Sequence, residues 1–155
     1  MSIDQVNYND YMEDYQGAAL ERHEDTEALS NSGRKVAAMH FGGCAVECLL
    51  KSMILASLSR GASQEWKTDS NNPGHTIYNP GHSLQNALRQ NNRLYHRAQR
   101  FQEVIKWMTI VENPDNQHFI EMRYSSNNPD DAEYKKWWSA YNSLRSWLQK
   151  QATQL

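Results

Sequence analysis

The segment 34–60 constrains the fold more than any other part of the sequence. As a helix it would be apolar most of the way round, with alanines and glycines on one side and large apolar residues elsewhere, namely Val46, Leu49, Leu50, Met53, Ile54 and Leu58. Such a helix has to be covered on most sides by other elements. Gly42 and Gly43 each cost about 1 kcal/mol relative to alanine inside a helix. We therefore expect a central helix that a neighbouring helix approaches closely at these two glycines.

The rest of the sequence supplies helices to cover it. Apolar residues recur at helical spacing, and polar segments at 30–33 and 61–81 and the sequence after Val111 interrupt the pattern. No convincing strand or repeat is found. The other predicted helices span 8–29, 83–91 and 93–111, and a last one begins after Pro129. We expect an all-α fold, an antiparallel up-and-down bundle of four to five helices, with residues 1–155 forming a single domain.

Uninterrupted apolar runs are short in this chain. The longest, around 49–58, is broken by Lys51, Ser52 and Ser57, whereas a membrane span needs about 20 residues. The first ten residues contain early acids and no apolar core, so no signal peptide is expected. These features predict a cytoplasmic protein that does not enter a membrane.

The two cysteines, Cys44 and Cys48, lie four residues apart. This spacing puts both on one face of a helix, where we interpret them as small buried apolar residues. The sequence has no CxxC pair to indicate zinc. No metal site and no cofactor are therefore expected.

Charge is unevenly distributed along the chain. Residues 1–60 contain nine acids and five bases, residues 61–111 three acids and six bases, and residues 112–155 six acids and five bases. Only the middle segment is net positive, and it is the part that would attract a polyanion.

Four arginines in that segment have helical spacing: Arg89, Arg93, Arg97 and Arg100. On a continuous helix they would form a basic stripe about 16 Å long, with His96 beside it. Guanidinium groups suit phosphate, and Tyr95 or Phe101 could stack on a base. The stripe is thus a candidate ligand-binding surface, and the alternative is an ordinary solvated helix face.

Glu47 and Lys51 are a second candidate pair. They lie four residues apart in the order that favours an ion pair on a helix. Glu47 could act as a general base or a ligand in a cleft, or it could be a buried carboxylate paired with Lys51. His75 and His82 repeat the context Asn-Pro-Gly-His, but they have no evident partners for a metal, and His82 is expected to help begin the next helix.

The last helix is rich in aromatic residues, with Trp137, Trp138 and Trp147 within eleven positions. Tryptophans at helical spacing are typical of a core or a subunit interface. This aromatic surface is larger than a small bundle needs to bury, and we therefore predict a homodimer.

Three elements, in order, resemble HEPN domains. The first is the run AMHFGGCAVECLLKSMI at 38–54, the second is GHSLQNAL at 81–88, and the third is Met-Arg-Tyr at 122–124 before a long final helix. HEPN domains are helical bundles, often dimeric. The resemblance implies one of their roles: an RNA-cleaving toxin, a partner of a nucleotidyltransferase, or a module that binds nucleotides.

The ribonuclease motif of that family, an arginine followed by a histidine five to seven positions later, is missing from the expected place. Arg123 begins the comparable stretch, and no histidine follows it. The spacing recurs elsewhere, in the pairs Arg34 with His40 and Arg89 with His96. We therefore expect a module that binds RNA, a nucleotide or a protein partner. The alternatives are a metal-independent endoribonuclease that uses one of these pairs, and a non-catalytic partner subunit of a nucleotidyltransferase.

Overall fold

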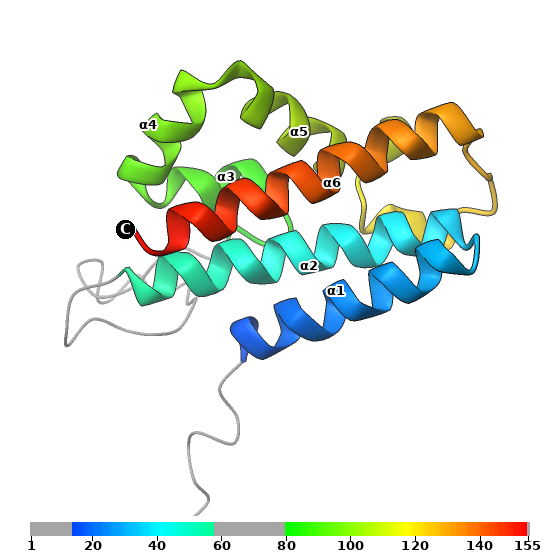
Figure 1. Ribbon diagram of the computed structural model, residues 1–155, viewed down its shortest axis with the longest axis horizontal. Coiled ribbons are helices and arrows are strands. Elements are labelled where there is room, and N and C mark those ends of the chain that lie inside the picture. The colour runs from blue at the N-terminus through cyan, green and yellow to red at the C-terminus, as the bar shows by residue number, and fades with distance from the viewer. Residues whose placement is uncertain (1–13, 58–79, 155) are drawn as a thin grey trace, which may run out of the picture.

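The computed structural model describes residues 14–57 and 80–154, and within them the protein is all-α. Six α helices and two short 3-10 helices are present in these ranges, without a strand (Figure 1). The α helices are α1 (Tyr15–Asn31), α2 (Lys35–Ala56), α3 (Leu84–Arg89), α4 (Asn92–Arg100), α5 (Gln102–Glu112) and α6 (Asp131–Ala152); the 3-10 helices are η3 (Pro114–Asn116) and η4 (Glu121–Tyr124).

Helix α2 lies at the centre, as its composition predicts. It forms an antiparallel hairpin with α1, and α6 runs along its other side (Figure 1). Its fully buried residues include Ala38, Val46, Leu50 and Ile54. By length and mean hydropathy α2 is also long and apolar enough to cross a membrane, although its uninterrupted apolar runs are short. Because 61% of that apolar window is buried inside the fold, the same composition is accounted for by a core helix.

The two ends of α1 follow local signals. Asp14 caps its beginning by accepting a hydrogen bond from Gly17 N, and Gly33, with a φ of +72°, reverses the chain before α2. The predicted start of this helix at Tyr8 lies outside the described residues. So does nearly all of the loop predicted at 61–81.

The close approach predicted at the two glycines is confirmed, with one correction. A Cβ on Gly42 would lie 2.5 Å from the ring of Trp137 on α6, so this glycine does mark a helix crossing. A Cβ on Gly43 would overlap the ring of Phe119, which precedes η4. The neighbour at Gly43 is therefore a connecting segment rather than a helix.

The prediction of a single helix at 93–111 is wrong, because two helices, α4 and α5, occupy this segment. The chain is extended at Phe101 (φ −118°, ψ 102°), and this break separates α4 from α5. In a continuous helix Val104 would point about 120° away from Ala98 around the axis. The break lets both residues enter the same core, where each is essentially fully buried, and leaves Phe101 54% exposed.

The aromatic face of α6 is used mainly inside the molecule. Trp137 and Tyr141 are buried and stack on each other at 5.1 Å, while Trp138 and Trp147 are half-buried and pack on the core. The large apolar side chains that remain exposed among the described residues are Leu20, Phe101 and Tyr124. The homodimer stays a prediction, but a surplus of tryptophan on α6 no longer supports it.

Candidate functional site

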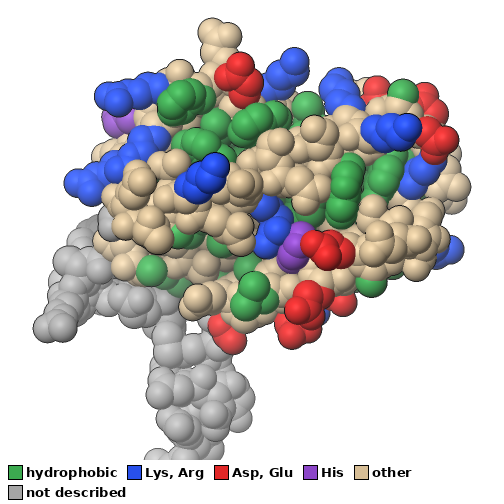
Figure 2. Space-filling view, in the orientation of Figure 1, with side chains coloured by type: hydrophobic (Ala, Val, Ile, Leu, Met, Phe, Trp, Pro, Cys, Tyr) green, Lys and Arg blue, Asp and Glu red, His purple; other side chains and the backbone are tan. Residues whose placement is uncertain are grey.

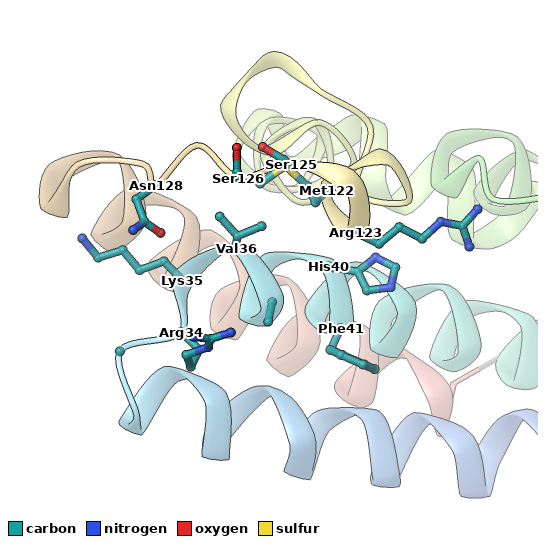
Figure 3. Close-up of a pocket in the computed structure, with 12 residues that line it drawn as sticks. Arg34, Lys35, Val36, His40, Phe41, Met122, Arg123, Ser125, Ser126 and Asn128 are labelled. Carbon is teal, nitrogen blue, oxygen red and sulfur yellow. The ribbon is translucent and has the colours of Figure 1, made fainter.

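A pocket of about 590 Å³ opens at the beginning of α2. Its walls are the first turns of α2, the helix η4 and the segment that leads from η4 to α6 (Figure 3). Arg34 and His40 both line it, so one of the two Arg/His pairs found by spacing is brought to a common site. Arg123 lines the same pocket from the opposite wall. Hereafter we name it the α2 pocket.

The first backbone N–H groups of α2 have no partner within the helix. Arg34 occupies the N-cap position, and its side chain makes no capping hydrogen bond. The first N–H bonded back along the chain is that of Ala38, to Arg34 O at 2.9 Å. The three preceding N–H groups, from Lys35 to Ala37, belong to residues that line the pocket. The start of a helix with free N–H groups carries partial positive charge and favours anions.

Side-chain charge adds to this effect. Three cations and no acid line the α2 pocket. Lys35 is already engaged, since its Nζ donates to Asp131 Oδ1 at 2.5 Å and to Pro129 O at 3.2 Å. Its hydrogen bond lowers the pKa of Asp131. Arg34 and Arg123 form no ion pair with a described acid, so their charge is available to a ligand.

Arg123 makes a cation–π contact with the neighbouring Tyr124. Its guanidinium lies 4.7 Å from the centre of the Tyr124 ring, and that ring is 79% exposed. In Figure 3 the Arg123 side chain extends past His40, away from Lys35 and Asn128. The pocket is thus lined by hydroxyl, amide and basic groups, with an exposed aromatic ring beside it.

His40 is held in one tautomer. Its Nδ1–H donates to Phe119 O at 2.9 Å, because a carbonyl can only accept. In the neutral ring Nε2 therefore keeps its lone pair. A histidine oriented in this way can accept a proton from a bound hydroxyl.

The basic stripe is not continuous. Arg89 ends α3, and the other three arginines lie on α4. Arg97 is occupied by the end of α6, where its guanidinium donates to Gln151 Oε1 at 3.3 Å and to Gln154 O at 3.1 Å. Arg93, His96 and Arg100 are exposed. Basic side chains gather at this end of the molecule in Figure 2. The 16 Å row required one continuous helix, and it does not form because α3 and α4 are separate helices.

Glu47 lies between two partners. Lys51 Nζ is 3.7 Å from Glu47 Oε2, and His82 Nδ1–H donates to Glu47 Oε1 at 2.6 Å. The Glu47 side chain is 12% exposed, and that of His82 is 56% exposed. Ser83, not His82, caps α3, by accepting a hydrogen bond from Asn86 N. Helical spacing predicted the pair of Glu47 with Lys51 but not the contact with His82, because no spacing relates residues 35 positions apart.

The backbone around His82 is fixed by further contacts. Lys51 Nζ donates to Gly81 O at 2.9 Å, and His118 Nε2–H donates to His82 O at 3.1 Å. The carboxylate of Glu112 accepts from the N–H groups of Leu84 and Gln85. These contacts join the start of α3 to α2, to α5 and to the segment before η4.

Cys44 and Cys48 are half-buried, not fully buried as predicted. Burial raises the pKa of the Cys44 thiol to about 12, so this thiol stays protonated. Among the residues that the structure describes, no group of three or more histidines, cysteines and acids is placed to hold a metal ion.

No family model, curated protein or solved structure matches this chain. What the chain can do is accordingly inferred from the geometry and chemistry of its own residues.

Proposed function

We propose that this protein is a HEPN-like helical bundle that binds the phosphate of a nucleotide or an RNA strand in the α2 pocket. The observation that carries the proposal is the uncapped start of α2, which opens into a pocket lined by Arg34 and Arg123 and by no acid. Backbone N–H groups and guanidinium groups are the donors that phosphate oxygens accept from most readily. The exposed Tyr124 ring beside the pocket supports a ligand that carries a base, because any base can stack on it.

The α4 surface is the second basic region, and it supports the proposal less well. Arg97 already binds the end of α6. Arg93 and Arg100 remain as exposed charges that would attract a polyanion without positioning it. We assign them a contribution to long-range attraction and assign the positioned contacts to the α2 pocket.

The test compares charge removal at the two places. Arg34→Ala and Arg123→Ala are measured against Arg93→Ala, which removes the same charge from α4. With a fluorescein-labelled single-stranded RNA, each pocket variant should weaken binding, and the plot of log affinity against log salt should become shallower by about 0.7 for each phosphate that the variant no longer neutralises. The Arg93→Ala variant should change both quantities less. Equal effects of all three variants would mean that binding is non-specific, and the pocket would lose its role.

A protein partner remains part of the proposal in two forms, a second copy of this chain and a nucleotidyltransferase-type subunit. Leu20 on α1 and Phe101 between α4 and α5 are single exposed apolar side chains, which by themselves do not mark a contact surface. Light scattering at micromolar concentration tests the dimer, which a stable monomer would exclude.

A further inference from the structure

Helix α4 carries a basic face that lies outside the α2 pocket. Between residues 89 and 106 the chain has five bases and one acid, Glu103. Arg93, His96 and Arg100 recur at positions i, i+3 and i+7, so they share one side of α4. All three are exposed, and neither arginine forms an ion pair with an acid that the structure describes. These three residues are named the α4 basic face.

An exposed phenylalanine follows this face directly. At Phe101 the chain is extended between α4 and α5, and this residue is 54% exposed. The corner between the two helices lies at the outer edge of the molecule, on the side away from α1 (Figure 1). At this end of Figure 2 apolar side chains lie beside basic ones. An exposed ring next to unpaired cations at an outer corner suits a partner that is flat, anionic at its surface and apolar beneath.

We propose that the α4 basic face and Phe101 bind the protein to the surface of a membrane that contains anionic phospholipids. The guanidinium groups lie over the anionic headgroups, and the ring of Phe101 enters the boundary between headgroups and acyl chains. The chain does not have to cross the bilayer for this contact, and α2 stays in the core. RNA is attracted by the same cations, and the experiment below separates the two partners.

The α2 pocket stays accessible in this arrangement. It lies where α6 begins, because its wall includes the segment that leads into α6. The α4 helix lies beside the other end of α6, where Arg97 contacts Gln151 and Gln154. The 22 residues of α6 separate these ends by about 33 Å. The protein is thus held at the membrane by one end while the other end is free to bind phosphate, and the membrane contact does not depend on phosphate binding.

The first measurement is sedimentation of the full chain with vesicles of two compositions. We expect binding to phosphatidylcholine vesicles that contain about 30% phosphatidylserine, and much weaker binding to phosphatidylcholine alone. Because the attraction is electrostatic, binding should weaken as the salt concentration rises from about 0.05 to 0.2 M. A wild-type protein that does not bind the anionic vesicles, or that binds both compositions equally, overturns the inference.

Variants test which residues make the contact. The double variant Arg93→Gln/Arg100→Gln should weaken vesicle binding roughly 25-fold, at about fivefold for each arginine. Arg34→Gln/Arg123→Gln removes two charges from the other end of the molecule and should change vesicle binding by no more than about twofold. An equal loss in both double variants would show that only net charge matters, and the α4 basic face would lose its role.

The aromatic contribution has its own matched pair. Phe101→Ser should weaken vesicle binding about three- to tenfold, whereas Phe101→Trp should restore it, because tryptophan favours the membrane interface. Leu20→Ser is the control, since Leu20 is 57% exposed on α1, away from this face, and its loss should have no effect.

RNA affinity of the same proteins separates this inference from the proposed function. Phe101→Ser should leave the affinity for the labelled single-stranded RNA within about twofold of the wild type. If Phe101→Ser weakens RNA binding and leaves vesicle binding intact, the surface serves RNA and the membrane contact is refuted. Circular dichroism melting shows that each variant is folded, and if one is not, the lipid dependence of the wild type decides. Failure of the Arg34 and Arg123 variants to weaken RNA binding bears on the α2 pocket alone.

Discussion

Replacing Gly42 or Gly43 by alanine should have two effects of opposite sign on the stability of the protein. Replacing glycine by alanine inside a helix stabilises it by about 1 kcal/mol. The new Cβ, however, would lie 2.5 Å from the ring of Trp137 at position 42 and would overlap the side chain of Phe119 at position 43. Both rings are at most 1% exposed, and a close-packed core gives them little room to move.

The balance should be destabilising. Overpacking a core costs about 1–3 kcal/mol, and contacts this short with rigid rings place these variants in the upper half of that range. After the propensity gain, we expect Gly42→Ala and Gly43→Ala to lose roughly 1–2 kcal/mol of unfolding free energy, since 2–3 is offset by about 1. At about 2–4 °C per kcal/mol for a chain of this size, Tm should fall by roughly 2–8 °C. Gly43→Leu should fall further.

Thermal and urea unfolding followed by circular dichroism provide the measurement. Ala28→Gly, at an exposed position of α1, reports the propensity term by itself and should cost about 1 kcal/mol. A side chain without the ring should relieve the clash, so Phe119→Leu should cost less in the Gly43→Ala background than in the wild type. If both alanine variants melt higher than the wild type, the glycines do not mark close contacts and the tight packing inferred at these positions is refuted.

The pKa of His23 is lowered from 6.5, mainly by burial and also by the nearby Arg145. Below about pH 6.5 the unfolded chain therefore binds more protons than the folded one, and stability should fall as the pH drops. His23→Gln should flatten urea midpoints measured from pH 7.5 to 5.5, and an unchanged slope would contradict this. Glu112→Gln weakens the acceptor for two N–H groups at the start of α3, so it should cost about 1–3 kcal/mol in chemical denaturation. Arg97→Ala removes a cation from the end of α6 and should lower stability by about 0.3–1 kcal/mol, whereas Arg93→Ala should not; equal melting of the two would contradict the Arg97 contact.

The sequence predicted what depends on periodicity along one helix. The apolar surround of α2 predicted its central position, and the cost of glycine in a helix predicted close contacts at Gly42 and Gly43. The break at Phe101 was not predictable in the same way, because no proline or glycine marks it. It follows from the need of two short helices to reach one core, which is a property of the tertiary packing.

In the candidate site, too, contacts within one helix were predictable from the sequence and contacts between distant segments were not. Spacing brought together Arg34 and His40, which are near in sequence. Arg123 was singled out only by resemblance, and its place opposite His40 depends on how η4 packs against α2. His82 meets Glu47 across 35 positions, and a single sequence holds no signal for that contact. Pairs on one helix can be inferred from spacing, whereas pairs between distant segments require the fold.

The contacts that surround His82 have a consequence for the integrity of the chain. Lys51, Glu47, His118 and Glu112 hold residues 81–85 to three separate parts of the bundle through side chains. The C-terminal half of α2 and the first turn of α3 are therefore joined by more than the backbone between them. A protein whose peptide chain is cut between Ser57 and Pro80 should stay assembled as two fragments, and the same two fragments, produced separately, should recombine into one molecule.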